Sequence, residues 1–162
     1  MKLEELQVHP DNNRIYSPTS LDDLEQSLQS YGQLEAISIT KSKRIISGHR
    51  RFMAMKNLGW EECEVRFIEP ENEIISLIEF NRHRQKTTKD ILNEARFLEK
   101  EIKKYVGSGR SAKDRGGKKQ GERLRTTMEV AERLGIGTTK LKQLMSISNY
   151  QPELVEEIDR GN

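Results

Sequence analysis

A glycine followed by three residues that can carry positive charge stands in the N-terminal half of the chain, Gly48-His49-Arg50-Arg51. Two isoleucines and a serine come directly before it. Arginine guanidinium groups bind phosphate oxygens through forked hydrogen bonds, and the free amides at the start of a helix attract anions. The sequence therefore predicts an anion-binding turn. An exposed basic helix start without a ligand is the alternative, because short glycine motifs are weak signals.

The residues on both sides of this turn predict the elements that hold it. Residues 44–47 are typical of a short buried strand, and Phe52, Met55 and Leu58 recur at helical spacing until Gly59. The turn would thus lie at the end of a strand, where α/β proteins commonly bind ligands.

The other patterns up to about residue 70 predict a small α/β unit of alternating strands and helices. Leucines at helical spacing and residues that alternate with period two carry this prediction. The expected elements are a strand at residues 3–8, a turn at 9–13, a helix that Thr19 or Ser20 caps and Gly32 ends, and strands at 36–40, 44–47 and 62–67.

Composition narrows the class of protein. The chain has 162 residues, of which 33% are hydrophobic and 33% charged, so no single large core is required. Its one cysteine, Cys63, permits no internal disulfide and supplies no metal-ligand cluster. The N-terminus lacks the apolar core of a signal peptide, and no apolar run approaches the ~20 residues that span a bilayer. We expect a cytoplasmic protein with no membrane partner.

The net charge of +2 hides an uneven distribution. Residues 1–80 carry a net charge of −5, residues 81–126 carry +9 and residues 127–162 carry −2. A basic block between acidic segments favours a polyanionic partner such as DNA, because neutralising phosphates releases counterions. A solvated helix face with a disordered linker is the alternative.

Helical patterns dominate after residue 72. A short helix is expected at residues 74–78, and a longer one should begin near Thr87 or Thr88 and end at Gly107. Residues 107–125 are basic, rich in glycine and poor in apolar residues, so they predict a mobile loop. Lys118 and Lys119 in this loop would contact DNA phosphates without sequence preference.

Residues 127–149 have the spacing of a helix-turn-helix. The first helix has Ala131 at the position where the two helices approach each other closely. A short turn that contains two glycines follows, and then a second helix. A plain helical hairpin is the alternative. The polar residues of the second helix that would face a DNA groove are Thr138, Thr139, Lys140, Lys142 and Gln143.

With these patterns placed, nearly the whole chain resembles the ParB partition-protein family and its relatives on plasmids, phages and mobile elements. Residues 32–37 resemble the segment near the family's cytidine pocket, and residues 47–51 resemble its Gly-Glu-Arg-Arg phosphate motif. Asn81 and Arg84 match the Asn-x-x-Arg end of a second nucleotide motif. The helix-turn-helix follows in the expected order.

The resemblance implies an α+β protein. A small ParB/sulfiredoxin-like α/β domain at residues 1–85 would precede an all-helical domain at 86–162. It implies CTP with Mg²⁺ as the cofactor, double-stranded DNA as the partner and a homodimer as the assembly. The residues that would hold the nucleotide are Gly48, His49, Arg50, Arg51, Asn81 and Arg84.

The chain departs from the family pattern at named positions. His49 replaces a glutamate, Ala36 replaces a proline, and Phe80 stands where an acidic residue is expected, with Glu79 one position early. A helix advances about 100° per residue, so a carboxylate at position 79 points away from the direction of position 80. We expect this shift to remove a magnesium contact.

The function implied is DNA binding in the partition or transcriptional regulation of a plasmid, phage or mobile element. The alternative is an enzyme on the same fold, a nucleotide hydrolase, kinase or nuclease, with His49 or Glu79 as a base or metal ligand. Thiol chemistry of the sulfiredoxin kind is disfavoured, because Gly48 occupies the position of the catalytic cysteine and Cys63 lies elsewhere.

Overall fold

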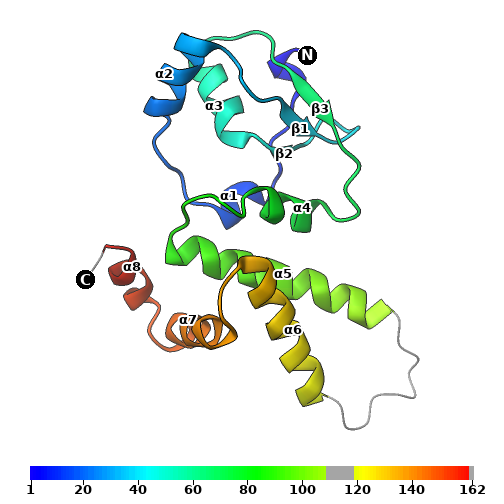
Figure 1. The fold of residues 1–162 in the computed structure, drawn as a ribbon, viewed down its shortest axis with the longest axis vertical. Coiled ribbons are helices and arrows are strands. Elements are labelled where there is room, and N and C mark those ends of the chain that lie inside the picture. The colour runs from blue at the N-terminus through cyan, green and yellow to red at the C-terminus, as the bar shows by residue number, and fades with distance from the viewer. Residues whose placement is uncertain (109–118, 161–162) are drawn as a thin grey trace. The chain divides into compact units, whose positions relative to one another are not determined.

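The computed structural model describes the backbone of residues 1–108 and 119–160 and the side chains of residues 1–104 and 124–160 (Figure 1). It divides into two compact units. The first comprises Met1–Arg14 and Pro18–Asn81, and the second comprises Ile15–Ser17 and Arg82–Asn162. The first holds a small sheet with helices and the second is helical, which confirms the expected α+β class.

The sheet of the first unit has three short strands in the order β2-β1-β3. The strands are β1 (Ile37–Ile39), β2 (Ile45–Ser47) and β3 (Val65–Phe67). β1 pairs with β2 antiparallel and with β3 parallel, so β1 is the central strand. All four isoleucines of β1 and β2 are buried, as expected for strands covered on both faces.

Helices accompany this sheet in the first unit. They are α1 (Asn12–Ile15), α2 (Asp22–Tyr31), α3 (His49–Asn57) and α4 (Glu73–Phe80), with a 3₁₀ turn, η1, at Leu3–Glu5. The N-cap residue of α2 is Leu21, without a side-chain cap, and not the predicted Thr19 or Ser20. The Ser20 hydroxyl still accepts a hydrogen bond of 3.2 Å from the Asp22 amide. Apolar side chains of the first unit form one core: Leu3, Leu6, Leu28, Ile37, Ile39, Ile45, Phe52, Ala54, Met55 and Cys63.

The prediction of a first strand at residues 3–8 is wrong. Leu3–Glu5 form η1, and the β-pairing of this segment consists of two isolated bridges, Lys2 to Glu62 and Gln7 to Arg44. A spacing of three lets Leu3 and Leu6 face the core together from a 3₁₀ turn, in which residues i and i+3 eclipse. The expected turn at residues 9–13 likewise runs into α1.

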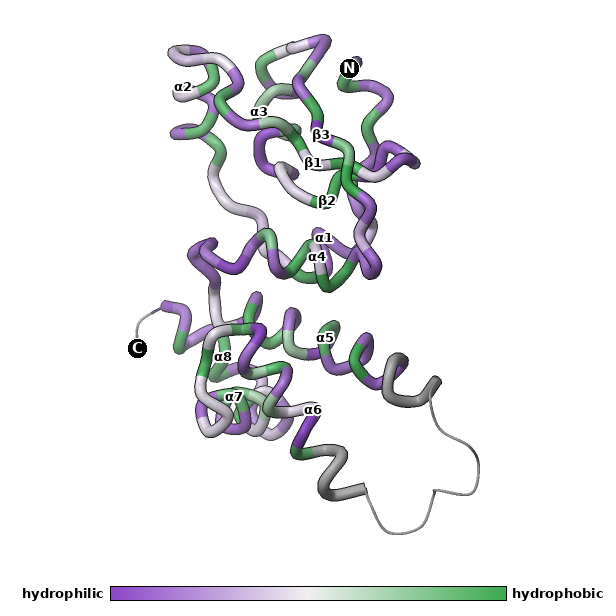
Figure 2. Tube along the Cα trace, turned by 45° about the vertical axis from the view of Figure 1, so that its right-hand side comes forward, coloured by the Kyte–Doolittle hydropathy of each residue, from purple (hydrophilic) through white to green (hydrophobic). Residues whose placement is uncertain are grey.

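The second unit packs helices α6 (Lys119–Leu134), α7 (Thr138–Tyr150) and α8 (Glu153–Asp159) against α5 (Thr88–Ser108). In Figure 2, α5 alternates between hydrophobic and hydrophilic positions, as an amphipathic helix does. Leu92, Ala95, Leu98 and Ile102 supply its buried stripe. In the part of the chain that the structure describes, no helix is both long and apolar enough to cross a membrane.

Both ends of the loop predicted at residues 107–125 are helical. Residues 107–108 end α5 and residues 119–125 belong to α6, while residues 109–118 lie outside the described part of the chain. Lysine, arginine, glutamate and glutamine are good helix formers, and they outweigh the single glycine at the start of α6.

A buried polar cluster lies inside the second unit. The Tyr16 hydroxyl donates a hydrogen bond of 2.6 Å to Glu94 Oε1, and Lys86 Nζ donates one of 2.9 Å to Glu94 Oε2. Burial raises the pKa of Glu94, although both of these bonds act to lower it. Burial likewise raises the pKa of Tyr16. Asp90 Oδ1 accepts the Ser17 amide at 2.8 Å, so the cluster ties residues 15–17 to α5.

The last helix caps the first helix of the same unit. Asp159, at the end of α8, accepts hydrogen bonds of 2.5 Å from the Thr88 amide and 3.3 Å from the Lys89 amide. Burial acts to raise the pKa of Asp159, but the bonds from these two residues outweigh it and lower that pKa. A carboxylate at this position satisfies amides that a helix start otherwise leaves free.

Candidate functional site

The turn between β2 and α3 requires glycine. Gly48 has a φ of +97°, and a Cβ added there would lie 3.3 Å from Ile37 Cγ1 and 3.4 Å from Ile37 Cα. Helix α3 begins directly after it. Gly48 is the N-cap residue of this helix, and it makes no side-chain hydrogen bond to the first amides. The predicted order of strand, glycine turn and helix is therefore confirmed.

His49 faces the interior of the first unit. Its ring is buried, and Nε2 accepts a hydrogen bond of 3.3 Å from the His9 amide. His9 is also buried, its Nδ1 accepts the Asp11 amide at 3.1 Å, and its Nε2 lies 3.4 Å from Glu73 Oε2. Burial lowers the pKa of His9, while the Glu73 carboxylate opposes that shift. This geometry gives the His49 ring a role in packing the turn.

The two arginines of the turn reach different parts of the first unit. Arg50 donates a hydrogen bond of 2.8 Å to the Ser20 carbonyl. Arg51 donates to the Glu35 carbonyl at 2.7 Å and to the Ala36 carbonyl at 3.1 Å, and its second nitrogen lies 2.5 Å from Glu35 Oε2. The guanidinium of Arg51 is therefore held at the segment that leads into β1.

Arg51 lines a cavity of about 390 Å³ in the first unit. The walls contribute two guanidinium groups, two hydroxyls, one carboxylate and one aromatic ring. Arg66 Nη2 donates a hydrogen bond of 3.0 Å to Ser38 Oγ, and the Phe80 side chain is 44% exposed. The lining residues are Glu35, Ala36, Ser38, Ser47, Arg51, Arg66 and Phe80. Such a set suits an anionic ligand that also has a flat apolar part.

Sequence reasoning missed Arg66 as a site residue. Its position in an alternating strand showed only that it faces away from Val65 and Phe67. The parallel pairing of β3 with β1 places Arg66 opposite Ser38, and a sequence does not show which strands will pair. Gln33 lies in the segment 32–37 that the sequence singled out, but its bonds to the Glu64 amide at 2.7 Å and to the Glu35 carbonyl at 3.0 Å were not predicted.

The predicted residues of the second nucleotide motif have local partners. Asn81 Nδ2 donates a hydrogen bond of 2.8 Å to the Leu77 carbonyl at the end of α4, and Asn81 is not a lining residue of the cavity. Arg84 belongs to the second unit, where its guanidinium lies 4.8 Å from the centre of the Tyr16 ring. It also donates to the Ser17 carbonyl at 3.2 Å.

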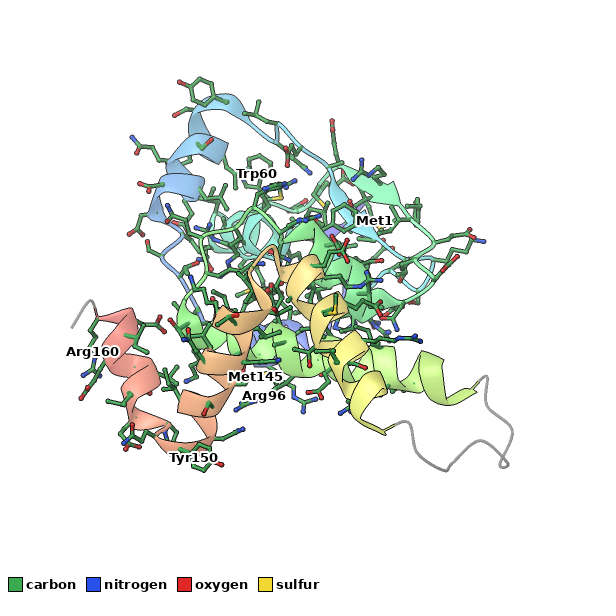
Figure 3. The ribbon with its side chains drawn as sticks, turned by 60° about the horizontal axis from the view of Figure 1, so that its bottom comes forward. Met1, Trp60, Arg96, Met145, Tyr150 and Arg160 are labelled. Atoms are coloured by element: carbon green, nitrogen blue, oxygen red, sulfur yellow. The ribbon has the colours of Figure 1, made fainter. Side chains whose placement is uncertain are left out.

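Helices α6 and α7 of the second unit are joined by a three-residue turn, residues 135–137, as a helix-turn-helix requires. Gly135 has a φ of +67°, and Ala131 and Leu141 are buried where the helices meet. Arg96 of α5 donates a hydrogen bond of 2.8 Å to Ser148 Oγ of α7. Figure 3 shows Tyr150 at the end of α7 with its side chain, 84% exposed, pointing outward.

The predicted DNA-facing residues are placed as follows. Thr138 is half-buried at the start of α7, and the other four side chains are exposed on the same helix: Thr139, Lys140, Lys142 and Gln143. Lys119 begins α6, but its side chain and the whole of Lys118 lie outside the described residues.

Comparison with known proteins identifies the first unit. Residues 1–80 match the family model of the ParB N-terminal domain. Residues 1–80 therefore form a domain of the ParB N-terminal family. No match is found among curated protein sequences.

Solved structures with the ParB fold are similar to most of the chain. A C222₁ crystal form of a Pnob8-like ParB N-domain is 16% identical with a TM-score of 0.67, covering 96% of this chain and 70% of that one. A pNOB8-like ParB N-domain is 18% identical with a TM-score of 0.63, covering 98% and 67%. A C-terminally truncated chromosome-partitioning ParB from Caulobacter crescentus, complexed to the centromeric parS site, is 17% identical with a TM-score of 0.56, covering 99% and 76%.

The donor set of this ParB domain does not fit a magnesium ion. Mg²⁺ at a phosphate site takes one or two protein carboxylates besides water and phosphate. Glu35 is the one carboxylate in the cavity lining, and it pairs with Arg51. Phe80 presents a ring to the cavity, and Glu79 is not a lining residue. Across the described residues, no group of three or more His, Cys, Asp or Glu side chains is placed to hold a metal ion.

Proposed function

We propose that this ParB-family chain is a DNA-binding protein of the partition or transcription-regulating kind, acting for a plasmid, phage or mobile element. Helix α7 carries the proposal. It follows a short glycine turn, exposes Lys140, Lys142 and Gln143, and contains no acidic residue over Thr138–Tyr150. A helix of this kind approaches a DNA groove without repulsion from the phosphates.

The test combines selection of a preferred duplex from random sequences with a salt series on that duplex and on a scrambled one. Gln143→Ala or Thr139→Ala should narrow the gap in binding free energy between the two duplexes by ~1–3 kcal/mol if its side chain touches a base edge. Replacing Lys118 and Lys119 with alanine should weaken both duplexes alike and reduce the salt slope by up to about 2. If both kinds of variant lose affinity without sequence preference, α7 is not a recognition helix.

We also propose that the cavity of the ParB domain binds the phosphate part of a nucleotide, with CTP as the first candidate. Two guanidinium groups, Arg51 and Arg66, stand in its wall, and the Gly48 turn opens α3 beside them. Calorimetry with CTP, UTP, ATP and GTP tests this. Arg51→Ala should weaken the preferred nucleotide by ~1.5–3 kcal/mol, the cost of a lost charge-assisted hydrogen bond.

The same site is proposed to bind its ligand without turning it over. His49, which the sequence offers as a general base, is buried and its Nε2 accepts the His9 amide. A base needs that lone pair to reach the proton it removes. Release of inorganic phosphate from CTP, or nicking of plasmid DNA, would favour the enzyme instead.

We propose a homodimer as the DNA-binding form. Two copies of α7 would then read half-sites about one helical turn of DNA apart, and the selected duplex should be a palindrome. Light scattering of the chain with and without that duplex measures the number of copies bound.

A further inference from the structure

The cavity wall of the ParB domain is rich in fixed positive charge and poor in carboxylates. Arg51 is held by two main-chain carbonyls and Arg66 by the Ser38 hydroxyl, so both guanidinium groups are positioned by the fold. Ser38 is buried, which anchors the Arg66 contact in the central strand. Prepositioned donors of this kind bind an anion with little loss of conformational entropy.

We propose that this cavity binds a nucleoside polyphosphate in its metal-free form, with Arg51 and Arg66 supplying the charge that a divalent cation otherwise supplies. The inference rests on the proposed nucleotide site and states which form of the ligand enters it. Phe80 supports it, because an aromatic ring in the wall gives no ligand to a metal ion and disfavours the hydrated shell that Mg²⁺ keeps.

The proposal predicts the direction of the magnesium effect. Mg²⁺ bound to a polyphosphate occupies oxygens that the guanidinium groups would otherwise contact, and it lowers the negative charge of the ligand. Affinity in EDTA should therefore equal or exceed affinity in Mg²⁺. A site that uses the metal as a bridge behaves in the opposite way.

A substitution at residue 80 tests whether an added carboxylate makes ligand binding depend on Mg²⁺. Phe80→Glu places a carboxylate in the cavity wall, where it would repel a free polyphosphate but could share a magnesium ion with one. This variant should bind more weakly than the parent in EDTA and recover affinity when Mg²⁺ is added. Phe80→Leu, which adds no charge, should show no such recovery.

The experiment is calorimetry of the full chain with CTP and with inorganic tripolyphosphate, each in EDTA and in Mg²⁺. Arg66→Gln should weaken both probes at least about tenfold in EDTA, and Arg66→Lys should lose less. Lys41→Gln removes the same charge from an exposed residue that is not in the cavity lining and should leave binding unchanged. Thermal unfolding of every variant shows whether it is folded.

The outcomes separate the two proposals. Binding that needs Mg²⁺, or that Mg²⁺ tightens more than about threefold, overturns metal-free binding while the nucleotide site stands. Loss in folded Arg66→Gln no greater than in Lys41→Gln overturns the role of Arg66. Absence of binding by the parent chain in both media overturns the nucleotide site and this inference together.

Discussion

In the first unit, Arg51 and Arg66 stand in the wall of an open cavity and are held by carbonyls, a hydroxyl and the side chain of Glu35, which is 76% exposed. In the second unit, Glu94 is 0% exposed, and its two oxygens accept hydrogen bonds from the buried Tyr16 and from Lys86, whose side chain is 9% exposed. In the first arrangement, an anionic ligand that entered the cavity would compete with an exposed carboxylate for Arg51. In the Glu94 cluster, both carboxylate oxygens already have partners within the protein, so the charges of this cluster stabilise the fold.

The largest effect expected from this comparison is a loss of stability in the second unit. Lys86→Met removes the cation beside Glu94 and leaves a buried carboxylate with the Tyr16 hydroxyl alone. Breaking a buried ion pair costs about 3–5 kcal/mol in the free energy of unfolding. Urea unfolding measures it, and Lys103→Met is the matched control, because the Lys103–Glu99 pair on the same helix α5 is exposed. An equal change in both variants would show that the Glu94 cluster is no special source of stability.

A smaller effect is expected from the backbone of the turn at Gly48, between β2 and α3. Gly48→Ala forces a side chain into a left-handed conformation and against Ile37, so we expect a loss of about 2 kcal/mol or more. Gly59→Ala has a similar φ, +73°, but an added Cβ there meets nothing within 4 Å. The difference in unfolding free energy between the two variants therefore isolates the contact with Ile37. Equal losses would leave the backbone conformation as the whole cause.

Next in size is the cap that closes the second unit. The folded state lowers the pKa of Asp159, so its carboxylate form is stabilising. This stability is present above the ordinary aspartate pKa of about 3.9 and is lost as the pH falls through the lower folded value. Asp159→Ala should cost about 1 kcal/mol at neutral pH, as the loss of a helix cap does. Its unfolding curve and that of the parent should converge in acid, and a constant difference down to the lowest pH would contradict the cap.

Local signals in the sequence predicted the parts that depend on a few neighbouring residues. Gly48 between a β-branched strand and an amphipathic helix was sufficient for the turn, and the two glycines after Leu134 were sufficient for the break between α6 and α7. Contacts between distant residues were not predictable. Arg66 reaches Ser38 across 28 residues and Tyr16 reaches Glu94 across 78, and no periodicity encodes such pairs.

The role that a residue type suggests can also be wrong when the side chain is buried. His49 lies in a basic motif and was predicted to face a ligand, yet the structure buries it against the His9 amide. Its neighbours in sequence gave no sign of this, because the histidine that it contacts lies 40 residues earlier. The strand predicted at residues 3–8 is wrong for a similar reason, because its leucines reach the core through a 3₁₀ turn.

The smallest effect expected concerns the exchange of Glu35 for a ligand. Glu35 Oε2 lies 2.5 Å from Arg51, so an incoming phosphate must displace this carboxylate before it can use the same guanidinium. Exposed ion pairs contribute only about 0.2–1 kcal/mol, and Glu35→Gln should therefore tighten the binding of tripolyphosphate by no more than about fivefold. Glu71→Gln makes the same change of net charge at an exposed residue that is not in the cavity lining, and it should produce little change. A high-salt series should shrink the difference between the two variants, because screening weakens the competing pair. Weaker binding in Glu35→Gln would mean that the carboxylate holds Arg51 in place for the ligand. The Glu35–Arg51 pair would then be a fixed contact like those of Glu94, and the contrast between the two units would be wrong at this pair.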